Sequence, residues 1–231
     1  MNLLAFDTST EALSAAVQKA GALVAEVSAT GGAHASASLI PVLQSLLARA
    51  GLRVTDLDAI VFGRGPGSFT GLRTACAVAQ GFGFAANVPV LGVDTLHAIA
   101  EDARARGGAT HVVALLDARM HEVYAARYAH DGKAWTRDGE IVLTRPEALD
   151  VPAGWALAGN AFGPYGGQLP SHAPRIEAQP SAAAMLRIAP HLIAAGRAQD
   201  AARAMPVYIR DKVAQTTEER AAARAAPPLK P

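Results

Sequence analysis

The chain has 231 residues, which is enough to bury a core as one large domain or as two small lobes. Hydrophobic residues make up 51%, charged residues 18%, and the mean hydropathy is +0.17, so we expect a compact protein with some apolar surface that contacts a partner. The formal net charge of +1 excludes a global basic field that could hold nucleic acid by phosphate contacts alone.

The chain opens with three predicted antiparallel strands, at residues Asn2–Ser9, Ala12–Gln18 and Leu23–Ser28. Asp7, Thr8 and Ser9 end the first strand, and this loop is similar to the first phosphate loop of the actin-like ATPases. A glycine normally lets the backbone approach phosphate there, but Ser9 stands at that position. We therefore interpret Asp7 first as a hairpin residue that caps backbone N–H groups, and only second as a catalyst or metal ligand.

A helix is predicted over Ser36–Gly51, because its apolar residues recur at helical spacing. They cover more than the one stripe that a surface helix needs. Burial between the sheet and a neighbouring helix would explain this, and so would an intermolecular face. The apolar positions are Leu39, Ile40, Val42, Leu43, Leu46, Leu47 and Ala50.

The stretch Gly63–Arg73 joins a buried strand at Ala59–Phe62 to a helical pattern at Thr74–Ala86. Ser68 or Thr70 is placed to cap that helix, and backbone N–H groups at such a start attract anions. The lysine of a P-loop is absent, and a dinucleotide fingerprint fails at Thr70. The alternative is that the glycines only make a tight turn.

The helix after this loop carries small residues at four-residue spacing, which makes one side a smooth groove. Such a groove allows close approach of another helix, either from a partner or from the same lobe. The residues are Gly71, Ala75, Ala79 and Gly83.

The first half ends with a strand at Pro89–Val93 and a helix to Arg106, and the pattern of three strands then restarts. The predicted strands of this second half are His111–Leu116, Glu122–Tyr128 and Glu140–Leu143. Asp117 and Glu122 flank the first of its hairpins, and we favour a structural ion pair with Arg119 over paired catalytic carboxylates. A strand at Trp155–Gly159, a glycine-rich turn at Asn160–Gly167, a helix at Ser181–Gly196 and a frayed tail complete the chain.

Four segments together resemble the TsaB (YeaZ) family of bacterial proteins, which are needed to make threonylcarbamoyladenosine beside the anticodon of certain tRNAs. They occur in family order and span nearly the whole chain. They are Leu4–Thr10, Gly65–Arg73, Asp117–Tyr124 and Pro206–Arg210.

The resemblance implies an α/β fold of the two-lobed actin-like ATPase (ASKHA) type, each lobe a mixed sheet that opens with three antiparallel strands and is packed with helices. The expected boundaries are residues 1–107 for a first lobe with the partner interface, 108–214 for a smaller second lobe, and 215–231 for a flexible tail. The expected interface residues are Leu39, Leu43, Leu46, Gly71, Leu72, Ala75, Ala79 and Gly83. A vestigial nucleotide site would comprise Asp7, Thr8, Ser9, Gly65, Gly67, Ser68 and Asp117.

The resemblance further implies a non-catalytic scaffold that binds the catalytic relative TsaD as a heterodimer, with the ATPase TsaE in the assembly and a homodimer when TsaD is absent. Contact with tRNA would be indirect, and no cofactor is expected. TsaD carries a paired-histidine metal motif where this chain has Thr95 and Ile99, so we expect no metal, and His97 between them is interpreted as structural. The alternative is an actin-like small-molecule kinase or ATPase.

The compartment is expected to be the cytoplasm. The one cysteine, Cys76, excludes an intramolecular disulfide and suits a reducing environment. Met1 runs straight into a strand that Asp7 interrupts, so no signal peptide is expected, and no long apolar run predicts a membrane-spanning helix. No triad spacing for a hydrolase occurs.

Overall fold

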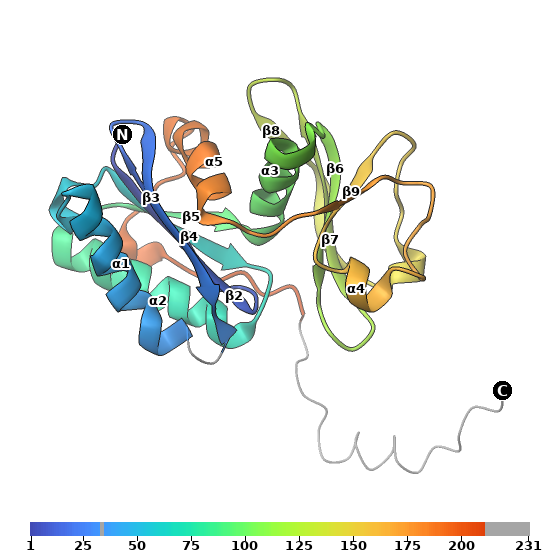
Figure 1. Cartoon of the computed structure of the whole chain (residues 1–231), viewed down its shortest axis with the longest axis horizontal. Helices are drawn as coiled ribbons and strands as arrows, with labels where there is room; N and C mark the ends of the chain where they lie inside the picture. The colour runs from blue at the N-terminus through green and yellow to red at the C-terminus, as the bar shows by residue number, and fades with distance from the viewer. Residues whose placement is uncertain (33–34, 211–231) are drawn as a thin grey trace, which may run out of the picture.

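The computed structural model describes residues 1–32 and 35–210, and the predicted tail at 215–231 lies outside them. Two five-stranded sheets stand beside each other, each with helices packed against it (Figure 1). No helix in the described part of the chain is long and apolar enough to cross a membrane.

The first sheet has the strand order β3-β2-β1-β4-β5. β1, β2 and β3 form an antiparallel meander, whereas β4 and β5 run parallel to β1. β1 is buried along its whole length because helices cover both faces of the sheet, which explains its continuous apolar run. The strands are β1 (Leu3–Asp7), β2 (Ala12–Lys19), β3 (Ala22–Thr30), β4 (Ala59–Gly65) and β5 (Val90–Asp94).

The second sheet repeats this topology in the order β10-β9-β6-β7-β8. β6, β7 and β8 are antiparallel neighbours, and β9 and β10 are added in parallel. The duplicated arrangement confirms the predicted two-lobed actin-like fold, although β10 was not predicted. The strands are β6 (His111–Asp117), β7 (Val123–His130), β8 (Trp135–Thr144), β9 (Ala156–Gly159) and β10 (Arg175–Glu177).

The helices cover the sheets by burying apolar stripes. α1 and α2 pack on one face of the first sheet and α5 on the other, while α3 packs on the second sheet (Figure 1). The α-helices are α1 (Ala35–Ala50), α2 (Phe69–Ala86), α3 (Thr95–Gly107), α4 (Phe162–Tyr165) and α5 (Ala182–Ala194). The 3₁₀ turns of the described residues include η2 (Val54–Asp56), η3 (Pro146–Ala148) and η4 (Ala201–Arg203).

Two details differ from the sequence-based expectation. The boundary at residues 107 and 108 assigned α5 to the second lobe, but Met185, Leu186 and Ile188 pack with β1 and β5 of the first sheet. The chain therefore returns to the first lobe after β10, because the apolar face of α5 covers the side of that sheet which α1 and α2 leave open. The glycine-rich turn at Asn160–Gly167 also contains the short helix α4.

Candidate functional site

Loops from both lobes converge on a small cavity of about 220 Å³ at the ends of β1, β4 and β6. The structure brings four of the predicted vestigial-site residues to its wall: Ser9, Gly67, Ser68 and Asp117. Asn160, which begins the predicted glycine-rich turn, also lines it. Asp7, Thr8 and Gly65 are not in this wall. The volume is below that of an ordinary small-molecule pocket, about 300–1,000 Å³.

The N-terminus of α2 is occupied by the chain itself. The Ser68 amide donates to the Ser9 carbonyl at 2.8 Å, and the Thr8 hydroxyl donates to the Gly71 carbonyl at 2.7 Å. Ser68 is the N-cap, and its hydroxyl accepts from the Gly71 amide at 3.5 Å. Two amides at this helix start, those of Ser68 and Gly71, are therefore used within the chain, and the first of them holds the β1–β2 loop.

Two glycines of the motif are required by this close packing. A Cβ at Gly67 would meet the backbone and side chain of Ser9, and a Cβ at Gly71 would meet the Thr8 carbonyl. Neither position can carry a side chain without moving the β1–β2 loop. These two glycines thus allow two backbone segments of the chain to pack closely together. In a nucleotide-binding loop, glycines instead allow the backbone to come close to a phosphate.

Asp7 is buried beneath the cavity, with 1% of its surface exposed. Its Oδ1 accepts hydrogen bonds from the Ser9 amide at 2.9 Å and from the Ser9 hydroxyl at 2.7 Å, whereas its Oδ2 has no partner among the described residues. Burial raises the pKa of Asp7 to about 6, against the two Ser9 hydrogen bonds, which lower it. These contacts agree with the interpretation of Asp7 as a residue that caps the hairpin.

Arg119 lies across the cavity and joins the two lobes. Its guanidinium pairs with Glu11 of the β1–β2 loop and with Asp117, each at 3.2 Å. Asp117 also accepts from the Tyr165 hydroxyl at 2.9 Å. Asp117 thus belongs to a structural network of hydrogen bonds and ion pairs, which agrees with the sequence-based preference for a structural role. The sequence did not predict the roles of Glu11 and Tyr165, because both residues lie far from Asp117 along the chain.

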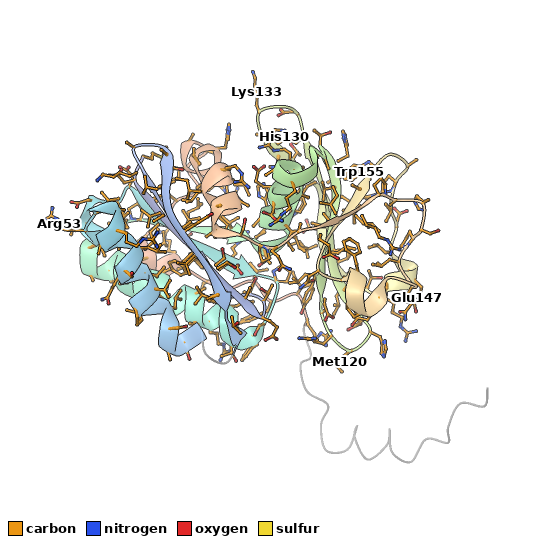
Figure 2. The ribbon with its side chains drawn as sticks, in the orientation of Figure 1. Arg53, Met120, His130, Lys133, Glu147 and Trp155 are labelled. Carbon is orange, nitrogen blue, oxygen red and sulfur yellow. The ribbon has the colours of Figure 1, made fainter. Side chains whose placement is uncertain are left out.

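The segment after η4 ties the remaining motifs together. The Val207 amide donates to the Arg64 carbonyl at 2.6 Å, and Arg210 donates to the Ala118 carbonyl at 3.0 Å and to Glu122 at 2.7 Å. Met120 lies at the exposed tip of the hairpin that Arg210 holds (Figure 2). The four sequence motifs therefore form one connected structure that spans the two lobes.

The positions of the paired-histidine motif are part of the core. Thr95 and Ile99 are fully buried, and the imidazole of His97 stacks on Tyr128 with ring centroids 5.1 Å apart. Burial lowers the pKa of His97 to about 4, although Asp94 and Glu101 act in the opposite direction. Within residues 1–32 and 35–210, no group of three or more His, Cys, Asp and Glu side chains could hold a metal ion.

The predicted interface residues lie inside their own lobe, and this corrects the expectation. Leu39, Leu43 and Leu46 of α1 are fully buried against the first sheet, as are Ala75 and Ala79 of α2, and Leu72 is 1% exposed. The positions of Gly71 and Gly83 are filled by Thr8 and by Ala201 with Val90. The smooth groove of α2 thus packs within the lobe, because it faces the sheet and η4.

The outer face of the same two helices remains apolar and exposed. Phe84 is 63% exposed, and Ile40 and Phe69 are also large exposed hydrophobic residues. Apart from its chain neighbours and the backbone of its own helix, no described residue comes within 4 Å of the position of a Cβ at Gly81, so the packing of these residues does not require a glycine there. At the start of α2, the Arg73 guanidinium lies 3.8 Å from the centroid of the Phe69 ring and donates to the Tyr208 hydroxyl at 3.0 Å.

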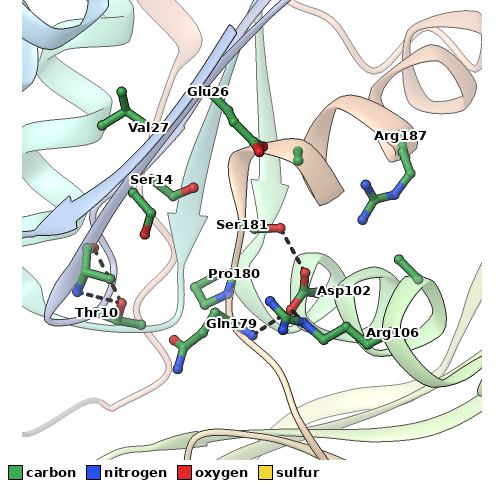
Figure 3. A pocket seen from close by; sticks show the side chains of 14 residues that line it. Thr10, Ser14, Glu26, Val27, Asp102, Arg106, Gln179, Pro180, Ser181 and Arg187 are labelled. Carbon is green, nitrogen blue, oxygen red and sulfur yellow. Dashed lines mark hydrogen bonds and ion pairs between the residues drawn. The ribbon is translucent and has the colours of Figure 1, made fainter. Parts of the chain in front are cut away.

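A further cleft of about 580 Å³ lies between β2, β3, α3 and the start of α5 (Figure 3). Asp102, which is buried, accepts there from Arg106 at 2.7 Å, from the Gln179 amide at 3.0 Å and from the Ser181 hydroxyl at 3.1 Å. Ser181 is also the N-cap of α5. The carboxylate therefore anchors α5 to α3, which is a structural role.

Comparison with known proteins identifies the family. The family described as TsaD, tRNA N6-adenosine threonylcarbamoyltransferase, matches residues 24–219. The chain is 34% identical to the tRNA threonylcarbamoyladenosine biosynthesis protein TsaB of Escherichia coli over 93% of this chain and 96% of the relative. It is 40% identical to TsaB of Haemophilus influenzae over 57% of this chain and 55% of the relative. The solved structure of YeaZ from Pseudomonas aeruginosa superposes with a TM-score of 0.84 at 38% identity, covering 90% of this chain and 99% of that one. The chain belongs to the TsaB (YeaZ) family.

Proposed function

We propose that this protein is a non-catalytic subunit of the machinery that makes threonylcarbamoyladenosine in tRNA, and that it acts by binding TsaD. The name of its E. coli relative, a tRNA threonylcarbamoyladenosine biosynthesis protein, supports the pathway. In this role the protein supports the transfer of threonylcarbamoyl to the adenosine next to the anticodon, while TsaD carries out the chemistry.

The observation that carries the non-catalytic role is the occupation of the nucleotide loop region by the chain itself. The start of α2 holds the Ser9 carbonyl, and Arg119 joins Glu11 and Asp117 across the remaining cavity of about 220 Å³. A nucleotide would have to displace these contacts. This arrangement argues against the alternative of an actin-like kinase or ATPase, which needs free amides for phosphate binding.

The outer face of α1 and α2 is the surface that we assign to TsaD. It presents Ile40, Phe69 and Phe84 to solvent, and aromatic residues of this kind are enriched in protein interfaces. A glycine in a helix interior costs about 1 kcal/mol relative to alanine. Gly81 has open space around it, and close approach of a partner helix would account for it.

The rest of the assembly follows from this role. TsaE joins the complex of this protein with TsaD, and tRNA is contacted only indirectly. When TsaD is absent, the same outer face supports a homodimer. The reaction takes place in the cytoplasm.

The test is a single substitution that affects the complex but not the isolated fold. Gly81→Leu places a large side chain on the outer face, where an added Cβ meets no described residue within 4 Å outside its own helix backbone and chain neighbours. Replacing glycine favours the helix by about 1 kcal/mol, so the isolated protein should melt no lower than the wild type. Overpacking of a helix contact typically costs about 1–3 kcal/mol, so the dissociation constant with TsaD should rise from about fivefold to about a hundredfold.

Binding is measured by calorimetry, and tRNA modification is measured in a reaction reconstituted with TsaD and TsaE. Ala194→Leu, at an exposed position of α5 on the opposite face of the sheet, is the matched control and should leave both readouts unchanged. Melting is followed at several protein concentrations, because loss of a homodimer also lowers apparent stability. A Gly81→Leu protein that binds TsaD and sustains modification like the wild type would contradict this surface.

The non-catalytic role has its own test. The protein alone should bind Mg-ATP weakly or not at all in a calorimetric titration and should hydrolyse none. Micromolar affinity, with turnover that is lost in Asp7→Ala, would make the kinase alternative the better one.

A further inference from the structure

A third and larger cleft, of about 1380 Å³, lies away from the loops described above. It is bordered by the edge strand β5, by β7 and β8 of the second lobe, and by the segment 195–203 that connects α5 to η4. It shares no lining residue with the cavity at Ser9 and Asp117. The proposed contact with TsaD does not use it.

Four arginines from three parts of the chain line this cleft: Arg64, Arg137, Arg197 and Arg203. Three acids share it, namely Asp94, Glu140 and Asp200. Asp94 binds two of the arginines at once, since it accepts from Arg64 Nε at 2.6 Å and from Arg137 Nη1 at 3.2 Å. The cleft therefore holds more cationic than anionic side chains.

Several of these donors are unused. Arg197 and Arg203 make no side-chain hydrogen bond or ion pair within the part of the chain that the structure describes, and Arg64 uses only its Nε, for Asp94. A guanidinium presents five N–H donors that suit carboxylate and phosphate oxygens. The cleft thus offers more donors than its own acceptors satisfy.

An independent observation comes from the wall of the cleft. Tyr128 is 2% exposed, and its hydroxyl has no hydrogen-bond partner among the described residues. Burial and the charge of Asp94 raise the pKa of this hydroxyl above its ordinary value and outweigh the nearby Arg137 and Arg64, which lower it, so it stays protonated and can donate. His97, stacked on Tyr128, has a buried Nε2 that also lacks a partner. Buried polar atoms without partners are rare in folded proteins and call for an explanation.

The backbone makes room for one of the arginines. A Cβ at Gly92 would lie 2.8 Å from Arg64 Cδ and 3.4 Å from the Phe62 ring. The missing side chain lets Arg64 cross β5 and reach Asp94. The arginine is therefore held in place over the edge of the sheet.

We propose that this cleft binds a phosphate group, with Arg64, Arg197 and Arg203 neutralising its charge and Tyr128 donating a hydrogen bond from the wall. A phosphate group supplies several acceptor oxygens with negative charge, which matches a cleft with several unused cationic donors. The volume accommodates a ligand larger than the phosphate itself. The phosphate belongs either to a small molecule or to the backbone of an RNA strand, and the second source would replace the indirect contact with tRNA that is proposed above.

The test uses the full-length protein without TsaD, so its result does not depend on the proposed complex. The probes are inorganic phosphate and AMP, followed by calorimetry, and a short single-stranded RNA, followed by fluorescence anisotropy at low and high salt. Arg197→Gln with Arg203→Gln removes two exposed cations whose side chains have no partner among the described residues. Arg49→Gln with Arg145→Gln removes the same charge from exposed positions outside the cleft.

The expected result is binding of at least one probe, weakened about tenfold or more by the variant in the cleft and little changed by the control, since charge-assisted hydrogen bonds are lost only in the first. Binding of phosphate or AMP would identify a small molecule, and salt-dependent binding of RNA alone would identify a nucleic-acid strand. Failure of all three probes to bind, or equal weakening by the two double variants, would overturn the proposal.

Tyr128→Phe gives a second readout that does not depend on net charge. The hydroxyl has no hydrogen-bond partner among the residues that the structure describes, so its removal should not lower the thermal midpoint. Binding of the same probe should still weaken. Affinity equal to that of the wild type would remove Tyr128 from the site.

Discussion

Asp7→Asn should stabilise the protein at neutral pH relative to the wild type, and the gain should depend on pH. Asn retains an oxygen that can accept both hydrogen bonds from Ser9. It removes the carboxylate charge from a site that is 1% exposed and in which Oδ2 has no partner among the described residues. Burying a carboxylate oxygen that has no hydrogen-bond partner or opposite charge is energetically unfavourable, and this cost is the reason why the pKa of Asp7 is raised.

The magnitude follows from the pKa of Asp7, which burial raises from 3.8 to about 6. The folded state holds this proton more tightly than the unfolded chain, so the stabilisation by the protonated group is fully present below pH 3.8 and is lost as the pH rises through about 6. With 1.36 kcal/mol for each pKa unit, the wild type should lose about 2–3 kcal/mol between pH 4 and pH 7.5 through this residue. The Asp7→Asn variant should not lose stability in this way, because its amide does not titrate.

The assay is urea unfolding followed by circular dichroism at pH 4 and pH 7.5 for wild type and Asp7→Asn. The difference in unfolding free energy between the two proteins should shift in favour of the variant by about 2–3 kcal/mol at the higher pH. Asp150→Asn, at a side chain that is 85% exposed, controls for the loss of one negative charge. A difference between Asp7→Asn and wild type that does not change with pH would refute the reasoning.

Three further substitutions probe the packing. Ala79→Leu should lower the thermal midpoint of the isolated protein at every protein concentration, because the residue is fully buried and overpacking costs about 1–3 kcal/mol; an unchanged midpoint would contradict its burial. Gly71→Ala should destabilise the fold, since its Cβ would meet the Thr8 carbonyl, and chemical denaturation measures the loss. For Glu101, burial raises the pKa, but hydrogen bonds from Arg104, Trp135 and Arg187 outweigh it and lower the pKa to about 2. The ionised Glu101 therefore contributes to stability above about pH 4.5, and this contribution is lost as the pH falls towards 2. The difference in unfolding free energy between wild type and Glu101→Gln should shrink in acid. A difference that stays constant with pH would contradict this role.

The sequence anticipated the order and type of most elements, because strand and helix patterns depend on neighbouring residues. The predicted strands at Ala12–Gln18 and Leu23–Ser28 correspond to β2 and β3, and the glycine turn followed by a helical pattern predicted α2. It also identified Ser68 as a possible N-cap and Asp117 as a structural residue. The family resemblance added the fold, which no local pattern determines.

Helix faces and the assignment of elements to lobes needed the tertiary structure. The spacing of Leu39 to Ala50 and of Gly71 to Gly83 showed that these surfaces pack closely, but the same spacing fits a helix in its own lobe and a helix in a partner. The sheet beneath α1 and α2 decided between the two, and the predicted interface was buried in the core. The placement of α5 on the first sheet was likewise decided by contacts between residues that lie far apart in the chain.

Residue type and short spacing are enough to predict the local elements and the motifs by which the family is recognised. The partners of the charged residues, in contrast, depend on the folded structure. Arg64 meets Asp94 across 30 positions, Arg119 meets Glu11 across 108, and Arg210 meets Glu122 across 88. Ion pairs of this kind form when the folded backbone brings two distant side chains together, so the periodicity of residues along the chain does not predict them.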